Sequence, residues 1–397
     1  MLNKLEIMKQ TILILTLLFT FTNLYSQRFL NPIFTNVTTT PNIVYGNALN
    51  VQGINQGLLL DFYEPLGDTL SNRPLIIYLH GGGFNDTTQT RQLPHIVSFC
   101  NSFALRGYAV ASIDYRLDSV PTCFSNRAII NAMHDAKASI RYFKANASIY
   151  KIDTTKIFLG GESAGAITSL NASYVNTMGE VLYPLTPPMS FDNSIEGNSG
   201  NIGYSSSVKA TLCLCGGTKV VSTLPVFDTS SINLNDNPAF IVHGSGDTLI
   251  PISYAVEIET RLNNLTIFNQ FYTFPGATHC PWFYTLPDAS FYLDSLVNFT
   301  SNFLYIFTST VGINETEQQK PNFSIYPNPT SQKIIIAFAT KEINNEQIEI
   351  YNSIGILVKT VEIKQLSTEI DLSGFSNGLY FAHLKNSNQS SIKFVKY

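Results

Sequence analysis

The chain has 397 residues, of which 44% are hydrophobic and 13% are charged, enough apolar material for a large core and for more than one domain. The formal net charge of −4 shows no basic excess, which excludes nucleic acid as an expected partner. The sequence also holds five cysteines, an odd number whose spacing does not suggest a metal site.

The N-terminus has the pattern of a targeting segment. Lys9 precedes an apolar run from Thr11 to Leu24, and Ser26 is a small residue suited to cleavage. Because the run is short for a membrane span, we expect a signal peptide over residues 1–26 and a protein that is secreted or held at the cell surface. An N-terminal anchor helix is the alternative, and no stable membrane span is expected elsewhere.

The segment 27–307 alternates between short apolar runs and helical patterns after a polar start, 27–57, which is rich in Asn and Thr and shows little periodicity. This alternation predicts an α/β fold, a mostly parallel central sheet flanked by helices. Residues 176–207, rich in Gly, Pro, Asn and Ser, interrupt it and are a candidate lid or cap. The expected strands are 58–63, 75–79, 108–113, 157–159, 210–214, 239–242 and 268–274, and the expected helices are 96–106, 126–148 and 252–262.

The character of the chain changes near its C-terminus. Residues 308–320 are polar and read as a linker. From residue 321 to 397, short runs of alternating apolar residues are separated by Asn, Gly and Ser turns. This pattern predicts a small all-β sandwich as a separate domain.

The string Gly161-Glu162-Ser163-Ala164-Gly165 lies between an expected strand and an expected helix. Strand, sharp turn and helix form the context of a nucleophile elbow, in which the serine stands at a strained corner. The sequence therefore predicts Ser163 as a catalytic nucleophile.

A glycine-rich string, His80-Gly81-Gly82-Gly83-Phe84, follows an earlier expected strand. Consecutive glycines let backbone N–H groups approach a substrate and donate to a developing oxyanion. Gly82, Gly83 and Ala164 are the candidate oxyanion-hole donors. A flexible loop is the alternative for a glycine triplet taken alone.

Two further residues complete a predicted triad. Asp247 follows an expected strand after a short turn, and His279 follows the last expected strand. In this fold the chain order is nucleophile, acid, base, which Ser163, Asp247 and His279 obey. The alternatives are a helix-capping aspartate and a structural histidine.

Residues adjacent to these motifs are candidate substrate-binding residues: Phe84, Glu162 and Trp282. For the aromatic cluster 282–284, packing against the last helix is the alternative. Among the cysteines, Cys100 and Cys123 form one candidate bridge, and Cys280 is either a partner of Cys213 or Cys215 or a buried thiol.

Together, the glycine string at 80–84, the elbow at 161–165, the stretch 243–251 and His279 resemble an α/β-hydrolase of the carboxylesterase and hormone-sensitive-lipase-like group. The similarity spans roughly residues 55 to 305. The resemblance implies an ester substrate, an acyl-enzyme on Ser163, and no metal or organic cofactor.

The C-terminal residues 321–397 resemble the sorting domain of the type IX secretion system of Bacteroidota. The matching strings include Tyr326-Pro327-Asn328-Pro329, Gly378-Leu379-Tyr380 and the terminal Lys393–Tyr397. The resemblance implies export by the type IX machinery. A carbohydrate-binding or adhesive module is the alternative.

These expectations combine into a secreted serine carboxylesterase. The expected substrate is a small-molecule or polysaccharide-linked ester, with a short acyl chain or an acetyl or feruloyl decoration. The alternatives are a lipase acting on longer acyl esters and a non-catalytic surface-binding protein that keeps the hydrolase fold.

Overall fold

A computed structural model describes residues 28–118, 126–181, 194–220, 224–283, 286, 288–308, 323–338, 346–352, 356–385 and 391–397. The predicted signal peptide, nearly all of the predicted linker, Cys123 and residues 182–193 of the predicted lid lie outside these ranges. The chain divides into two compact units, Met1–Ser309 and Thr310–Tyr397. None of the described helices is long and apolar enough to cross a membrane.

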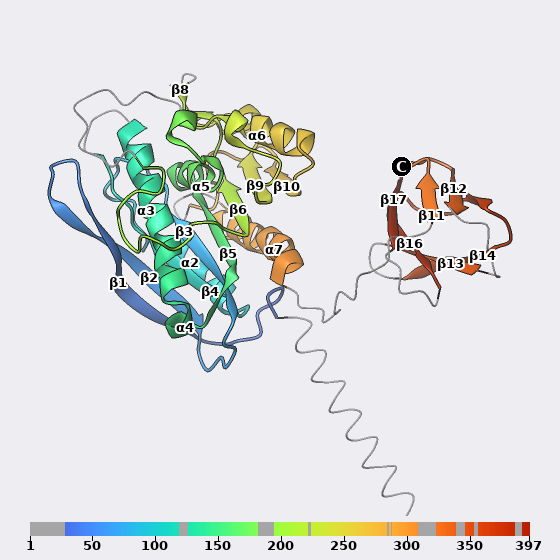
Figure 1. Cartoon of the computed structure of the whole chain (residues 1–397), viewed down its shortest axis with the longest axis horizontal. Coiled ribbons are helices and arrows are strands. Elements are labelled where there is room, and N and C mark those ends of the chain that lie inside the picture. Colours follow the sequence, from blue (N-terminus) through green and yellow to red (C-terminus); the bar gives the residue numbers. More distant parts are fainter. Residues whose placement is uncertain are drawn as a thin grey trace, which may run out of the picture. The chain divides into compact units, whose positions relative to one another are not determined.

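The first unit is built on an eight-stranded sheet in the order β1-β2-β4-β3-β5-β6-β9-β10 (Figure 1). β1 and β2 pair antiparallel, β2 is antiparallel to β4, and the remaining neighbours are parallel. This arrangement confirms the predicted α/β fold class. The strands are β1 Val37–Leu49, β2 Asn55–Pro65, β3 Arg73–Leu79, β4 Ala109–Ile113, β5 Ile152–Glu162, β6 Ala210–Leu214, β9 Ala239–Gly244 and β10 Asn269–Phe274.

Helices cover both faces of this sheet, and each face has its own core. In β3, Leu75, Ile77 and Leu79 belong to one buried cluster, whereas Ile76 and Tyr78 belong to the other. Successive side chains of a strand point to opposite faces, so a strand covered on both sides is apolar throughout. The helices are α2 Pro94–Ala104, α3 Asn126–Ala145, α4 Ala147–Tyr150, α5 Ala164–Tyr174, α6 Ile252–Asn264 and α7 Ala289–Thr308.

The edge strand β1 lies in the polar segment 27–57, in which the sequence showed little periodicity and no strand was identified. β1 pairs with β2 on one side only, and residues 38–42 are exposed. An exposed edge strand needs no apolar alternation, which removes the pattern by which strands are recognised in a sequence.

The predicted lid, residues 176–207, connects the end of α5 to the start of β6. This connection begins and ends at the amino ends of the parallel strands, whereas Ser163 follows the carboxyl end of β5. Of its described residues, 194–207 lie against α3, where Glu196 forms an ion pair with Lys137 at 2.9 Å. The prediction of a lid over Ser163 is therefore wrong for this part.

The second unit consists of two antiparallel sheets, β11-β12-β15 and β14-β13-β16-β17. One apolar cluster draws on both sheets, including Ile334 and Ile370 from one and Ile348 and Phe394 from the other. The unit is thus all-β, as the alternation predicted. The strands are β11 Phe323–Tyr326, β12 Lys333–Phe338, β13 Glu346–Asn352, β14 Leu357–Ile363, β15 Ser367–Asp371, β16 Gly378–Leu384 and β17 Ile392–Lys396.

Candidate active site

Ser163 occupies the corner between β5 and α5, with φ 53° and ψ −116°. A non-glycine residue rarely adopts positive φ, and such strain persists only where the surroundings impose it. Here the two flanking glycines permit close packing on β3. A Cβ on Gly161 would lie 2.4 Å from the carbonyl oxygen of Leu79, and a Cβ on Gly165 would lie 2.2 Å from the same atom.

The structure brings Ser163, Asp247 and His279 together at the carboxyl ends of the strands. The Nε2 atom of His279 lies 2.9 Å from the Ser163 Oγ, and its Nδ1 lies 2.6 Å from the Asp247 Oδ2. Because an ionised carboxylate only accepts, Nδ1 carries the proton and Nε2 is left to accept the serine hydroxyl proton. This is the geometry of a nucleophile, a base and an orienting acid.

The carboxylate of Asp247 accepts hydrogen bonds from four groups. The backbone N–H groups of Leu249 and Ile250 donate to Oδ1 at 2.9 and 2.8 Å. His279 donates to Oδ2, and the Nε2 of His243 lies 3.2 Å from the same oxygen. Burial raises the pKa of Asp247, but the hydrogen bonds from His243 and His279 outweigh it and hold that pKa well below its usual range.

His243 is a site residue that the sequence reasoning did not assign. It is fully buried at the end of β9, and its Nε2 also lies 2.7 Å from the carbonyl oxygen of Ile250. A proton on Nε2 can serve both acceptors, and the Nδ1 has no hydrogen-bond partner among the described residues. Its position four residues before Asp247, on a strand end, is the sequence feature that could have indicated this role.

A disulfide joins Cys215 and Cys280, whose Cα atoms are 5.7 Å apart. Cys280 directly follows His279, and Cys215 directly follows β6, whose Leu214 carbonyl accepts the Ser163 N–H at 3.0 Å. The bridge thus ties the histidine loop to the strand beside the nucleophile. Cys100 is a free, buried thiol, which contradicts the candidate bridge to Cys123.

The three predicted oxyanion-hole residues lie near the same site. Gly82 and Gly83 have φ values of 105° and 60°, and both line a pocket with Ser163 and His279. Ala164 is the first residue of α5, where helix N–H groups lack intrahelical partners. Within the described ranges, the N–H groups of Gly82, Gly83 and Ala164 donate no hydrogen bond to another protein group, which leaves them available to an oxyanion.

The pocket above Ser163 is small, with a volume of about 330 Å³. One wall is the loop that continues the glycine string, and the other carries the apolar side chains of Leu249 and Phe283. The lining residues are Gly82, Gly83, Asn85, Asp86, Gln89, Ser163, Leu249, His279 and Phe283.

The three predicted substrate-binding residues lie beneath this pocket rather than in its lining. Glu162 is fully buried and accepts from the Tyr78 hydroxyl at 2.9 Å, from His95 Nε2 at 2.8 Å and from Trp282 Nε1 at 2.7 Å. Phe84 is also fully buried. This placement argues against direct contact of these residues with a substrate. The aromatic side chain that lines the pocket is that of Phe283, the neighbour of Trp282.

The charge on Glu162 is compensated within the core. Burial raises the pKa of this carboxyl, but the neighbouring His95 and the hydrogen bonds from Trp282 and Tyr78 lower it below its ordinary value. These hydrogen bonds link Glu162, the residue next to Ser163, to His95 of α2 and to Trp282 in the segment that follows His279. Glu162 therefore supports the elbow from below.

Comparison with known families and structures agrees with this architecture. Residues 60–226 match the BD-FAE family, and residues 324–396 match the secretion system C-terminal sorting domain. A search of curated proteins gives no match.

Esterase 2 of Thermogutta terrifontis is similar in structure. Its form phosphorylated by paraoxon has 20% sequence identity and a TM-score of 0.55, covering 68% of this chain and 94% of that one. The propionate-bound form has 20% identity and a TM-score of 0.53, with 67% and 94% covered. At this identity the likeness shows the fold.

The fold and the family match define the first unit as an α/β-hydrolase of the esterase and lipase-like type. The second unit is a type IX secretion system sorting domain, which indicates secretion or export to the cell surface. The chain therefore joins a domain with an esterase-like hydrolase fold to a sorting domain.

Proposed function

We propose that this protein is a secreted serine carboxylesterase that cleaves short-chain carboxylic esters through an acyl-enzyme on Ser163. The observation that carries the proposal is the pair of hydrogen bonds that His279 makes, accepting from the Ser163 hydroxyl and donating to Asp247. A non-catalytic relative has no need for three side chains joined by hydrogen bonds in this way. The strained backbone of Ser163 also supports a catalytic role.

In the proposed reaction, the Ser163 Oγ attacks the ester carbonyl carbon while His279 Nε2 accepts the hydroxyl proton. Asp247 keeps the imidazole in the required tautomer and stabilises its charged form. The N–H groups of Gly82, Gly83 and Ala164 donate to the oxyanion. His279 then gives its proton to the departing alcohol, and water releases the acyl group by the reverse sequence of transfers.

The small pocket favours a short or compact acyl group. Its volume of about 330 Å³ lies at the lower end of the range for ligand sites, and Leu249 and Phe283 supply its apolar wall. The similar Thermogutta terrifontis esterase has been seen with propionate and with butyrate bound. Acetyl or feruloyl groups on polysaccharides belong to the same proposal, because the exported protein would meet such esters outside the cell.

The proposed maturation begins with removal of the signal peptide, residues 1–26, and continues with export through the type IX machinery. The sorting-domain match at 324–396 supports this route. The mature enzyme would act on extracellular esters without a cofactor.

Replacement of Ser163 tests the chemistry. Ser163→Ala should lower the kcat for p-nitrophenyl acetate by at least about 10³-fold and abolish labelling by a fluorophosphonate. Ser169→Ala is the matched control, because Ser169 is a buried serine of α5 whose hydroxyl donates to the Gly165 carbonyl at 2.8 Å. A wild-type protein that neither turns over aryl esters nor takes the label would refute the proposal.

A panel of acyl chain lengths tests the substrate class. We expect kcat/KM to be highest for acetyl to butyryl esters and to fall for octanoyl and longer esters, because a longer chain exceeds the pocket. Feruloyl esters and acetylated xylan complete the panel. A maximum at palmitoyl esters would instead identify a lipase.

A further inference from the structure

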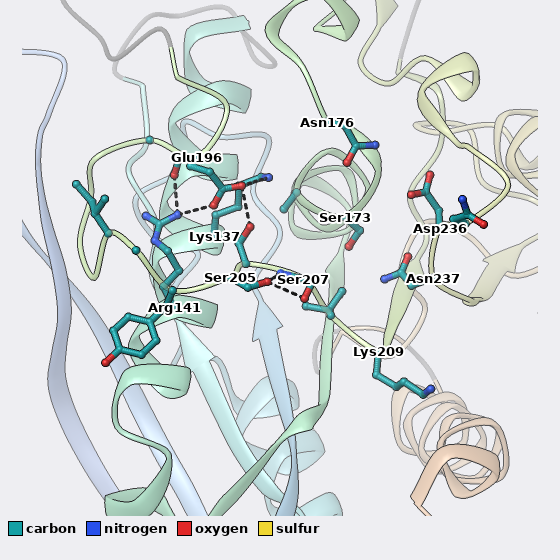
Figure 2. A pocket seen from close by; sticks show the side chains of 18 of the residues that line it. Lys137, Arg141, Ser173, Asn176, Glu196, Ser205, Ser207, Lys209, Asp236 and Asn237 are labelled. Carbon is teal, nitrogen blue, oxygen red and sulfur yellow. Dashed lines mark hydrogen bonds and ion pairs between the residues drawn. The ribbon is translucent and has the colours of Figure 1, made fainter.

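A larger groove, of about 950 Å³, lies away from the triad. Its walls come from α3, the end of α5, residues 196–209 and the loop 235–238 (Figure 2). It shares no lining residue with the pocket above Ser163.

The groove lies at the opposite end of the strands from the triad. β6 begins directly after Lys209 and β9 directly after Pro238, and both residues line the groove. Helix α5 starts beside Ser163 and ends at Tyr174, where the groove begins. Any ligand held here is thus separated from the triad by the length of α5.

The wall formed by residues 196–207 is held by ion pairs with two buried cations. Glu196 accepts from Lys137 Nζ at 2.9 Å, from Arg141 Nη1 at 3.0 Å and from the Ser206 hydroxyl at 2.9 Å (Figure 2). Arg141 also donates to the backbone carbonyl of Gly200 at 3.0 Å. Buried cations that are paired in this way hold the segment in one arrangement, so the groove exists before a ligand arrives.

Hydroxyl and amide side chains are the largest group in the lining, and they can both donate and accept hydrogen bonds. The two buried cations face Glu196, and Lys209 lies over the Phe307 ring at 5.7 Å. The Oγ of Ser173 is buried without a hydrogen-bond partner among the described residues. The polar lining residues without charge include Ser173, Asn176, Ser205, Ser207, Asn235 and Asn237.

This lining suits an uncharged ligand better than an anion. Glu196 is neutralised by its two cations, and Asp236, on the other side of the groove in Figure 2, adds a carboxylate that would repel a phosphate or a uronate. Burial raises the pKa of Asp236, as expected for a carboxyl in a recess without a cationic partner. Neutral hydroxyl groups match the donors and acceptors without any charge to be desolvated.

The rim adds exposed apolar surface. Tyr204 is 50% exposed and Ile202 is 75% exposed, although both line the groove. An exposed aromatic face beside amide and hydroxyl groups fits the two faces of a sugar ring, which present C–H groups and hydroxyls.

We propose that this groove binds a neutral saccharide chain. The binding goes beyond ester hydrolysis and does not depend on Ser163. The sorting domain supports it, because an exported protein works where polysaccharides are found. The groove would hold the enzyme on a polymer while the triad acts at the other end of the fold.

Affinity electrophoresis of the full chain tests the proposal, with gels that contain arabinoxylan, galactomannan, mixed-linkage glucan, alginate or polygalacturonate. We expect at least one neutral polysaccharide to retard the wild type. The Tyr204→Ala/Asn235→Ala variant should bind about tenfold more weakly, which corresponds to about 1.4 kcal/mol. Leu66→Ala is the control, because Leu66 is 61% exposed and lies outside the groove.

Hydrolysis of p-nitrophenyl acetate separates this proposal from the proposed function. The groove variant should keep the wild-type kcat and melting temperature, and Ser163→Ala should bind polysaccharide like the wild type. If the double variant melts earlier than the wild type, Asn235→Ala alone replaces it, since this side chain is exposed. The proposal is overturned by retardation in no neutral gel, by equal retardation of the variant, or by retardation in acidic gels only.

Discussion

Removal of the disulfide between Cys215 and Cys280 tests how the loop that carries His279 is held. The Cys215→Ala/Cys280→Ala variant keeps the triad side chains but releases the link from this loop to the end of β6. The bridge closes a loop with a sequence separation of 65 residues. Loop-closure entropy for that length corresponds to about 4 kcal/mol of folding free energy at 25 °C.

The expected change in stability follows from this figure. At about 2 °C per kcal/mol for a domain of this size, the melting temperature should fall by about 8 °C. The kcat for p-nitrophenyl acetate should fall by about tenfold or more, because a base displaced by a fraction of an ångström transfers the serine proton poorly.

Differential scanning calorimetry and single-turnover kinetics measure the two effects. Cys213→Ala is the matched control, because Cys213 is a free, buried thiol on β6 and its loss should cost only about 1 kcal/mol. A double variant that melts and turns over like Cys213→Ala would refute the reasoning that the bridge positions His279.

Two further predictions concern the acid of the triad. The folded-state pKa of Asp247 is lowered below its unfolded value of about 3.9, so its carboxylate stabilises the fold above that pH, and this contribution is lost as the pH falls below about 4 toward the folded pKa. Melting temperatures recorded from pH 6 to pH 2 should therefore fall more steeply for the wild type than for Asp247→Asn, and parallel curves would contradict this. His243→Leu removes one donor from Asp247 and should lower kcat by about tenfold or more, since a hydrogen bond to a charged group contributes about 1.5–3 kcal/mol. His243→Gln keeps a donor and should retain more activity, whereas equal losses in both variants would indicate a packing role alone.

Much of the architecture was predictable because it depends on local patterns. Apolar runs that alternate with helical periodicity predicted the parallel sheet, and chain order led to Ser163, Asp247 and His279, which the structure brings within hydrogen-bond distance. The edge strand β1 was missed because its exposed residues carry no apolar alternation. Local patterning thus predicts buried strands better than exposed ones.

The remaining errors have a different physical origin. Glu162 neighbours Ser163, but adjacent residues on an extended strand point to opposite sides. Phe84 lies in a turn with a φ of 68° and is buried, so proximity along the chain did not place either residue in the pocket. The pairing of Cys215 with Cys280 crosses 65 residues and depends on how two loops meet in space. Composition indicated an irregular segment at 176–207. It did not indicate that this segment starts and ends at the amino ends of the parallel strands, away from Ser163.

Helix α5 begins beside Ser163 and ends where the groove begins. Its eleven residues span about 16 Å at 1.5 Å per residue. A polymer lying in the groove therefore cannot present its nearest ester to Ser163 without looping around the domain. The ester that is cleaved would belong to a neighbouring polysaccharide molecule. The enzyme would then act between adjacent polysaccharide molecules of a matrix rather than along the one to which it is bound.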